Sequence, residues 1–276
     1  MKNLKKLSLL AASALLAVAF LAAGCGSDSA SSGSSSKNTT VTVGATPVPH
    51  GEILNEIKPL LAKEGVDLKV VEFTDYVKPN LALNDKELDA NFFQHSPYLD
   101  KFNSEHGTKL KAIAKIHVEP MGIYSHKIKD LKDLPDGAKV AIPNDPTNGG
   151  RALLILQSAG LIGLKDGGNI TSTVQDVEKN DKHLQFVELD AAQIPRSLDD
   201  TDLACVNTNY AIPAGLNPQK DSILVESKDS PYANVMAVRQ GDENNETYKK
   251  VLAIYQSEPI KKFIEEHFQG TILPAF

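Results

Sequence analysis

A chain of 276 residues, 41% hydrophobic and 23% charged, is long enough for two domains and has the composition of a folded protein. Its formal charge is −6 and its basic residues form no stripe, which argues against a nucleic-acid-binding protein because such binding depends on neutralising phosphates. Of the two cysteines, Cys25 and Cys205, the first lies close to the N-terminus. If Cys25 has another role, no internal disulfide can form and the fold must rest on its hydrophobic core.

The N-terminus has the three parts of a secretory leader: a lysine-bearing start, an uncharged run over 7–23, and small residues that end at Cys25. An uncleaved membrane helix is the alternative, although the run is at the short edge of what spans a bilayer. Residues 21–25 resemble a lipobox, in which cleavage leaves the cysteine as a lipid-bearing N-terminus. We therefore predict a lipoprotein signal peptide over 1–24 and a diacylated Cys25, since two acyl chains suffice for stable anchoring.

A flexible tether follows the predicted lipid site. Residues 26–40 are mostly serine with glycine, a composition that cannot form a core. We therefore assign the lipidated cysteine and its tether to residues 25–40. The protein is expected on the extracytoplasmic face of the cell membrane, held there by its lipid.

Beyond the tether, short strand-like and helix-like runs alternate, which is typical of an α/β fold. The first part predicts strands at 41–45, 68–73, 89–93 and 110–118 (running on through 122–124), and helices at 50–63, 77–84 and 97–105. The pattern then restarts, with strands at 139–143, 185–189, 203–206, 223–226 and 234–239, and helices at 151–159, 243–256 and 259–268. Two α/β halves joined by crossing strands, at 117–125 outward and 232–239 on return, would suit a hinged binding protein.

Motifs of common enzyme classes are absent from the sequence. It contains no phosphate-binding loop, no dinucleotide fingerprint, no nucleophile elbow and neither H-E-x-x-H nor C-x-x-C. Cys205 lies in an apolar run and is interpreted as a small buried hydrophobic residue rather than a nucleophile. These absences are weak evidence against an enzyme.

Four stretches, at 45–50, 89–99, 143–151 and 206–211, resemble the NlpA (MetQ) family of methionine-binding lipoproteins. The string Phe-Phe-Gln-His-Ser-Pro-Tyr-Leu at 92–99 is the most specific of them. The order and spacing match from about residue 41 to the C-terminus.

The resemblance implies a two-lobed, type II periplasmic-binding-protein-like fold with the ligand in the cleft between the lobes. On this basis we place lobe 1 at 41–121 with 236–276, and lobe 2 at 122–235. The implied function is capture of methionine for an ABC importer, through its permease and ATPase, by a monomeric protein that is not an enzyme and needs no cofactor. D-methionine or a methionine-containing dipeptide is an alternative cargo.

A free amino acid presents a carboxylate and an ammonium, and neither can be buried without partners. Arg151 can bind a carboxylate, and it follows Asn148 and two glycines at an expected helix start, where backbone N–H groups can approach an anion. The alternative is a surface arginine paired with an acid. Asn207 and Asn209 lie just past a predicted strand, where loops of α/β lobes meet ligands. An Asx-turn is the alternative for them, and we favour Asn209 as the ligand contact.

The side-chain pocket is assigned to aromatic residues, because a thioether favours aromatic edges. We predict that Phe92, His95 and Tyr98 form it, with Tyr76 as a further wall. Alternation along the strand allows only one of the two adjacent phenylalanines to line the pocket, and we choose the first. His95 has the alternative of a helix cap or a satisfied buried histidine.

Two other functions compete with amino-acid binding. A metal-ion cargo would use His50, His95, His117 and Glu119, although the histidines have no ligand-like spacing. His117 and Glu119 lie on a crossing strand from which they could reach the cleft floor, and we rank them below the aromatic residues as ligand contacts. A secreted hydrolase would use Ser96 beside His95, although no oxyanion motif accompanies them.

Overall fold

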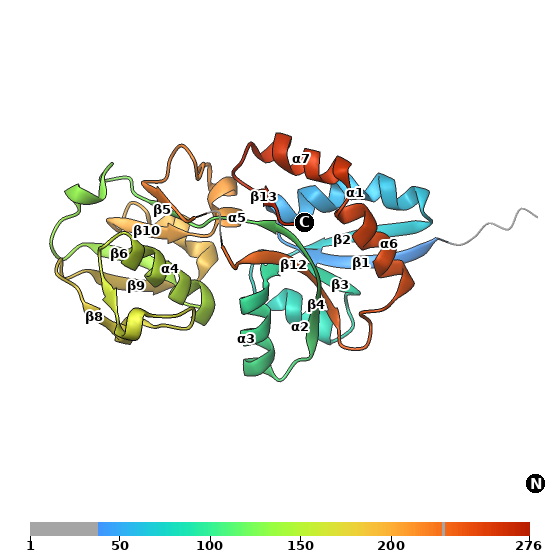
Figure 1. Ribbon diagram of the computed structural model, residues 1–276, viewed down its shortest axis with the longest axis horizontal. Coiled ribbons are helices and arrows are strands. Elements are labelled where there is room, and N and C mark those ends of the chain that lie inside the picture. The colour runs from blue at the N-terminus through green and yellow to red at the C-terminus, as the bar shows by residue number, and fades with distance from the viewer. Residues whose placement is uncertain (1–37, 228–229) are drawn as a thin grey trace, which may run out of the picture. The chain divides into compact units, whose positions relative to one another are not determined.

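The computed structural model describes residues 38–227 and 230–276, which belong to one compact unit (Figure 1). The predicted signal peptide, Cys25 and nearly all of the tether lie outside the described residues. The strands are β1 (Thr39–Ala45), β2 (Val66–Glu72), β3 (Ala90–His95), β4 (Leu110–Val118), β5 (Gly122–Tyr124), β6 (Lys139–Pro143), β7 (Gly163–Leu164), β8 (Val177–Lys179), β9 (Gln185–Leu189), β10 (Leu203–Val206), β11 (Leu224–Val225), β12 (Ala233–Arg239) and β13 (Leu273–Pro274). The α-helices are α1 (Glu52–Lys63), α2 (Lys78–Asn84), α3 (Ser96–His106), α4 (Pro146–Ser158), α5 (Thr208–Ala211), α6 (Glu246–Tyr255) and α7 (Glu258–Phe268).

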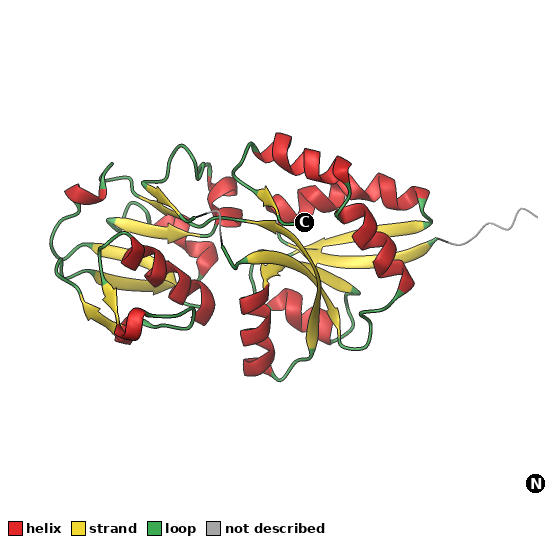
Figure 2. Ribbon diagram, viewed as in Figure 1, coloured by secondary structure: helices red, strands yellow, loops and turns green. Residues whose placement is uncertain are grey.

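The first lobe is built on a six-stranded sheet with the order β13-β4-β12-β3-β1-β2. Strands β1, β2 and β3 are parallel, whereas β12 runs antiparallel to both of its neighbours, β3 and β4. Helices α1, α6 and α7 cover one face of this sheet and α2 and α3 the other (Figures 1 and 2). The C-terminal third of the lobe therefore completes a sheet that the N-terminal strands begin.

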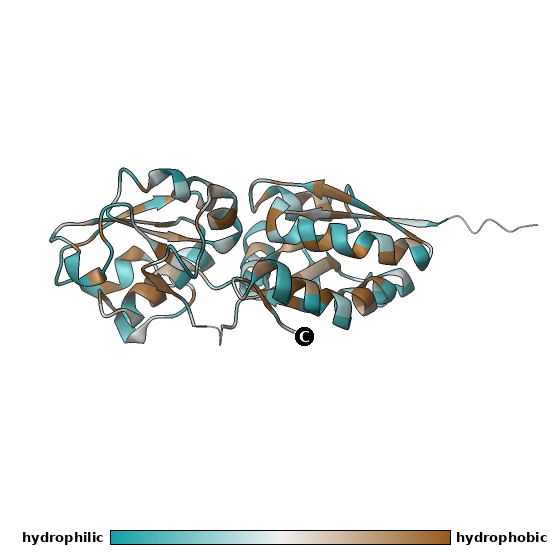
Figure 3. Ribbon diagram, turned by 90° about the horizontal axis from the view of Figure 1, so that it is seen from above, coloured by the Kyte–Doolittle hydropathy of each residue, from teal (hydrophilic) through white to brown (hydrophobic). Residues whose placement is uncertain are grey.

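Strand β12 shows how the core of the first lobe forms. Met236 and Val238 pack with α1, α6 and α7, while Val235 and Ala237 pack with α2 and α3. Both faces of the strand are buried, which explains its unbroken apolar sequence. The helices around it carry hydrophilic and hydrophobic turns side by side, as expected for helices buried on one face (Figure 3).

The second lobe is built on a five-stranded sheet with the order β11-β5-β10-β6-β9. Strands β6, β9 and β10 are parallel, and β5 is antiparallel to β10 and β11. Helix α4 packs on one face through Leu153 and Leu156. The short helix η5 (Ala191–Ser197) packs with Ile194 on the other face.

The chain passes from β4 to β5 through residues 119–121, and it returns between the end of β11 and Ala233. The return strand β12 pairs only with strands of the first sheet, so the whole of it belongs to the first lobe's sheet. The lobe limits drawn from the sequence, which divide at 121/122 and 235/236, stay predictions.

Most predicted elements are found within a few residues of their expected bounds, and the strands expected at 139–143, 185–189 and 203–206 have those bounds. The helix expected over 151–159 is wrong at its start, because α4 begins five residues earlier, at Pro146. Asp145 caps this helix by accepting a hydrogen bond from the backbone N–H of Asn148 at 2.9 Å.

Candidate functional site

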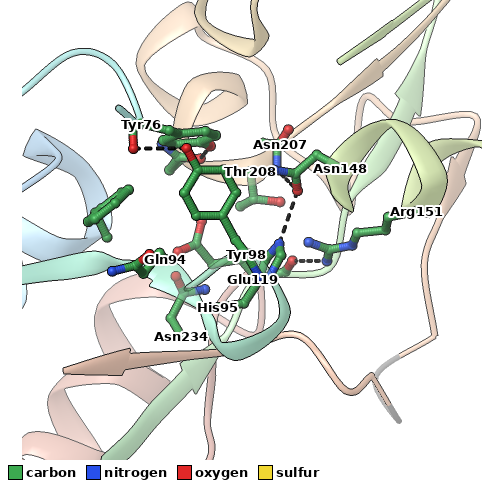
Figure 4. A pocket seen from close by; sticks show the side chains of 12 residues that line it. Tyr76, Gln94, His95, Tyr98, Glu119, Asn148, Arg151, Asn207, Thr208 and Asn234 are labelled. Carbon is green, nitrogen blue, oxygen red and sulfur yellow. Dashed lines mark hydrogen bonds between the residues drawn. The ribbon is translucent and has the colours of Figure 1, made fainter. Parts of the chain in front are cut away.

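A pocket lies between the two lobes, and seven of the eight residues predicted to bind ligand line it (Figure 4). The first lobe contributes Tyr76, Phe93, Gln94, His95, Tyr98 and Asn234, the second Asn148, Arg151, Asn207, Thr208 and Asn209, and the crossing segment Glu119. The side chains therefore come from strand ends and helix starts of both sheets.

The choice of Phe92 as a pocket residue is wrong in this structure. Phe93 lines the pocket, whereas Phe92 is fully buried in the first lobe's core, with its ring centre 5.2 Å from that of Tyr255. Both phenylalanines are buried because β3 is covered on its two faces. The apolar pattern therefore carries no information on which of them faces the cleft.

Three aromatic rings form one wall of the pocket. Tyr76, Phe93 and Tyr98 have ring centres separated by 5.8–6.1 Å. The Tyr98 hydroxyl donates to the backbone oxygen of Tyr76 at 2.9 Å, which holds two of the rings in place. Such a wall offers aromatic faces and edges to an apolar or sulfur-bearing group.

Arg151 is only 3% exposed and is held by the second lobe. Its Nε donates to Oε1 of Glu226 at 3.0 Å, and its Nη2 donates both to Oε2 of Glu226 and to the backbone oxygen of Glu119. The Tyr232 ring lies 4.3 Å from the guanidinium carbon. Within residues 38–227 and 230–276, no acceptor is found for Nη1. Arg151 is thus both paired with an acid and part of the pocket lining.

The two glycines before Arg151 do not open the helix end to an anion, as the sequence suggested. A Cβ on Gly149 would lie 2.8 Å from the backbone oxygen of Pro143, and one on Gly150 would lie 2.3 Å from that of Ile170. The glycines let the first turns of α4 pack against backbone. Asp145 occupies the helix N-terminus instead.

A chain of hydrogen bonds joins the lobes at His95. Its Nδ1 accepts from the backbone N–H of Tyr98 at 3.1 Å and caps α3, so its proton is on Nε2, which donates to Oδ1 of Asn148 at 3.1 Å. The same Asn148 oxygen accepts from Nδ2 of Asn207 at 3.0 Å, and Asn148 donates in turn to Asp145. His95 is therefore a helix cap and a pocket residue at once.

Asn207 and Asn209 leave polar atoms unused in the pocket. The Tyr76 hydroxyl donates to Oδ1 of Asn209 at 2.6 Å, a second hydrogen bond between the lobes. The Oδ1 atom of Asn207 and the Nδ2 atom of Asn209 are buried and have no partner among the described residues. Since buried polar atoms are nearly always paired, these two are the natural places for a ligand to bond.

Glu119 is buried at the pocket floor beside two histidines. Its Oε1 lies 2.7 Å from Nε2 of His117 and 3.2 Å from Nε2 of His50. The other Nε2 contact of His50 is Oδ1 of Asn234, also at 3.2 Å. His50, His117 and Glu119 are three of the four residues proposed above as metal ligands. The fourth, His95, instead donates from its Nε2 to Asn148.

The geometry of this group is that of a hydrogen-bonded cluster. Two atoms bound to one tetrahedral zinc ion at about 2.0–2.1 Å stand roughly 3.3 Å apart. The 2.7 Å between His117 and Glu119 is shorter than that and is an ordinary N–H···O distance.

Burial lowers the pKa values of the two histidines and raises the pKa of the glutamate. Desolvation lowers the pKa of His50 to about 4 and that of His117 to about 3, so both rings are neutral at pH 7. Desolvation raises the pKa of Glu119, whereas a positive charge on His50 in its protonated form, the charge of Arg151 and the backbone N–H of Asn209 act to lower it. The pKa of His95 falls to about 3, chiefly through burial and secondly through Arg151.

The hydrolase alternative finds no support in the geometry around Ser96. Both ring nitrogens of His95 are engaged, one with the backbone of Tyr98 and the other with Asn148, so neither is available as a base for its neighbour. Cys205 is fully buried in β10 as predicted, and burial raises the pKa of its thiol to about 12.

Several pocket residues were not found from the sequence. Asn234 is the one strongly polar residue inside the apolar run of β12, and a polar side chain in a buried strand is the signal that could have identified it. Glu226 does not line the pocket itself but pairs with Arg151; it follows the two-residue strand β11, and no local pattern marks it. Gln94 and Thr208 sit within stretches already singled out but were not chosen.

Comparisons with known proteins agree with this architecture. The family model for NlpA lipoproteins matches residues 41–276. The chain is 42% identical over 270 residues to the probable D-methionine-binding lipoprotein MetQ of Vibrio cholerae, covering 97% of each. It is 42% identical over 266 residues to the methionine-binding lipoprotein MetQ of Bacillus subtilis, covering 95% of this chain and 96% of the relative. A solved nutrient-binding protein from Burkholderia cenocepacia bound to methionine is 48% identical, with a TM-score of 0.83 over 86% of this chain and 100% of that one.

Two α/β lobes with a polar pocket between them define a substrate-binding protein of the periplasmic type. More particularly, the chain belongs to the NlpA lipoprotein family, which confirms the resemblance drawn from its four stretches. In the part of the chain that the structure describes, no helix combines the length and the apolar character needed to span a bilayer.

Proposed function

We propose that the protein captures L-methionine in the pocket and delivers it to the permease and ATPase of an ABC importer. The observation that carries the proposal is a set of hydrogen-bond donors and acceptors lining the pocket, two of which, Nδ2 of Asn209 and Oδ1 of Asn207, are buried without a partner in the described chain. Nη1 of Arg151 and Nδ2 of Asn209 can donate, while Oδ1 of Asn207 and the Glu119 carboxylate can accept. A zwitterionic amino acid requires such a set, because both of its charged ends lose water on entering the pocket.

In this proposal Arg151 binds the ligand carboxylate through Nη1, while Glu226 retains Nε and Nη2. Asn209 adds a neutral donor. The ammonium lies against the carboxylate of Glu119, with the amide oxygen of Asn207 as a further acceptor. Charge-assisted hydrogen bonds of this kind contribute about 1.5–3 kcal/mol each.

The aromatic wall of Tyr76, Phe93 and Tyr98 is assigned to the methionine side chain. Burying a side chain of this size contributes roughly 1.5–3 kcal/mol, and each contact between sulfur and an aromatic ring adds about 0.3–1.5 kcal/mol. L-norleucine, which has a methylene in place of sulfur, should therefore bind about 2- to 10-fold more weakly than L-methionine.

Ligand entry and release require the lobes to separate. The bonds from Tyr76 to Asn209 and from His95 to Asn148 cross between the lobes on the pocket's own lining. They have to open for an amino acid to pass, and the crossing segment at 119–121, which lies between β4 and β5, is a place where the backbone can bend.

The family and the N-terminal sequence support a further part of the proposal. Cleavage before Cys25 and diacylation of that residue would hold the protein, as a monomer, on the extracytoplasmic face of the cell membrane. The role is binding without catalysis.

Isothermal titration calorimetry tests the proposal, using protein that has been unfolded, dialysed and refolded to remove carried-over ligand. One molar equivalent of L-methionine should bind, while zinc chloride should produce no stoichiometric heat. Because one relative is named for D-methionine, the D-enantiomer and a glycyl-methionine dipeptide are titrated in parallel. Tighter binding of either would reassign the cargo, and absence of heat and of any thermal shift with all three at millimolar concentration would contradict the proposal.

A further inference from the structure

The floor of the pocket contains an unusual group in which two imidazole rings face one carboxylate oxygen. His50 comes from the helical turn before α1, His117 from the end of β4, and Glu119 from the crossing segment. The side chains of the two histidines are 0–1% exposed and that of Glu119 is 7% exposed. Only Glu119 of the three lines the pocket.

The hydrogen bonds of this group determine where its protons lie. Nε2 of His50 faces two oxygen acceptors, Oε1 of Glu119 and Oδ1 of Asn234, so the ring proton is on Nε2 and Nδ1 accepts from the hydroxyl of Thr46 at 2.7 Å. Nε2 of His117 likewise donates to Glu119 at 2.7 Å. Nδ1 of His117 is buried without a partner in the described chain. With both rings neutral, the group as a whole carries one negative charge.

We infer that His50, His117 and Glu119 act as one proton-holding unit, in which the two imidazole N–H groups position the carboxylate for a ligand ammonium and the ammonium displaces the proton that the unit takes up in acid. The inference rests on the proposed function, because it needs a ligand with an ammonium group at Glu119. It adds two positioning residues beneath the pocket and makes ligand binding release a proton.

The other groups around the unit leave Glu119 as its one anion. Arg151 approaches through the backbone oxygen of Glu119 and is neutralised by Glu226. Tyr76 and Tyr210 donate their hydroxyls to other acceptors, and burial raises the pKa of both, so they stay neutral. Uncharged neighbours of the two rings include Thr46, Asn234 and Phe92, and Phe92 lies edge-on to both, at 4.6 and 5.2 Å between ring centres.

The proton balance follows from these charges. When the free protein takes up one proton, the unit becomes neutral, whether the proton is on the carboxylate or on an imidazole. A ligand that arrives as R–NH₃⁺ binds the anionic form, so the proton leaves for solvent and no other bond changes. Burial raises the pKa of Glu119, so this release extends to a higher pH than it would for an exposed carboxyl group, and it is lost as the pH rises through the titration range of the unit. The affinity for the ligand is highest above the pH range in which the unit titrates, and it falls by up to about tenfold per pH unit below that range.

Calorimetry in pairs of buffers with different ionisation enthalpies measures this release directly. L-methionine is titrated into the purified protein at pH 5.0 and at pH 7.5. We expect more proton release per ligand at pH 5.0 than at pH 7.5, and weaker binding at the lower pH. The ligand's own ammonium and carboxylate do not titrate in this interval, so the protons come from the protein.

Two substitutions of His117 separate its role in positioning Glu119 from its contribution to packing. H117Q keeps an N–H donor near the position of Nε2 but cannot take up a proton, so we expect affinity within about threefold of the parent at pH 7.5. H117L removes the donor, which makes Glu119 harder to ionise, so proton release should appear at a higher pH than in the parent. E119Q should release no proton and bind at least tenfold more weakly. The parent measurements keep the test decisive if a variant fails to fold.

The outcomes distinguish this inference from the function on which it rests. Tight methionine binding at pH 7.5 with no proton release and no loss of affinity at pH 5.0 overturns the proton-holding unit but leaves methionine binding intact. Equal pH profiles for the parent and H117L overturn the positioning role of His117. Stoichiometric zinc binding that H117Q abolishes overturns the unit in favour of a metal site, and absence of methionine binding overturns both proposals.

Discussion

Replacing Arg151 with glutamine removes the guanidinium charge and keeps a polar side chain beside Glu226. In the structure Arg151 has one nitrogen, Nη1, without an acceptor among residues 38–227 and 230–276, and we assign it to the ligand carboxylate. Losing one charge-assisted hydrogen bond costs about 1.5–3 kcal/mol, which corresponds to about 10- to 150-fold weaker binding of L-methionine. Isothermal titration at pH 7.5 measures this loss.

The same substitution leaves Glu226 without its cation, and the Glu226 side chain is only 12% exposed. We therefore expect R151Q to unfold more easily, by about 1–3 kcal/mol in chemical denaturation. The double variant R151Q/E226Q removes both charges and should recover part of that stability without recovering affinity. A folded R151Q protein that binds methionine as tightly as the parent would refute the carboxylate role of Arg151.

Three further predictions concern packing and pocket contacts. F92A should lower the free energy of unfolding by about 3–5 kcal/mol because the Phe92 ring is in the core, whereas F93A should mainly weaken methionine binding. Chemical denaturation and calorimetric titration of both variants measure these effects. The reverse result would exchange the roles of the two rings. Y76F removes one hydrogen bond between the lobes and should weaken binding by about 2- to 10-fold, and calorimetry showing unchanged affinity would contradict this. G150A should destabilise the protein by about 1–3 kcal/mol, because the added Cβ would meet the backbone oxygen of Ile170 at 2.3 Å; an unchanged denaturation midpoint would speak against that packing.

The site residues near strand ends and helix starts could be predicted from the sequence, because local sequence patterns mark such positions. His95 ends β3, Asn207 directly follows β10, and Asn148 lies in the first turn of the helix after β6; side chains at such positions meet ligands in α/β lobes. The polar residues stand out there against apolar neighbours. Their joint placement in one pocket depends on the two sheets, for which the family resemblance supplied the expectation.

Other features had no such local signal. Strand β3 is covered on both faces, so nothing in the order Phe92-Phe93 reveals which ring turns toward the cleft. Glu226 is one of 35 acidic residues, and its role comes only from a contact with a helix 75 residues earlier. The start of α4 could have been predicted from the sequence, because aspartate followed by proline at 145–146 is a strong N-terminal cap pattern.

The position of β12 has a consequence for the order in which the protein can assemble. This strand lies between β3 and β4 in the sheet, and α6 and α7 close the core behind it, yet all three come from the last 44 residues of the chain. During synthesis, β3 and β4 therefore stay without their shared neighbour until residues 233–239 have been made, by which time every strand of the second sheet is already present. The lobe that starts first is therefore completed last, and a truncation that reaches back to residues 233–239 would remove the middle of its sheet as well as the edge strand β13.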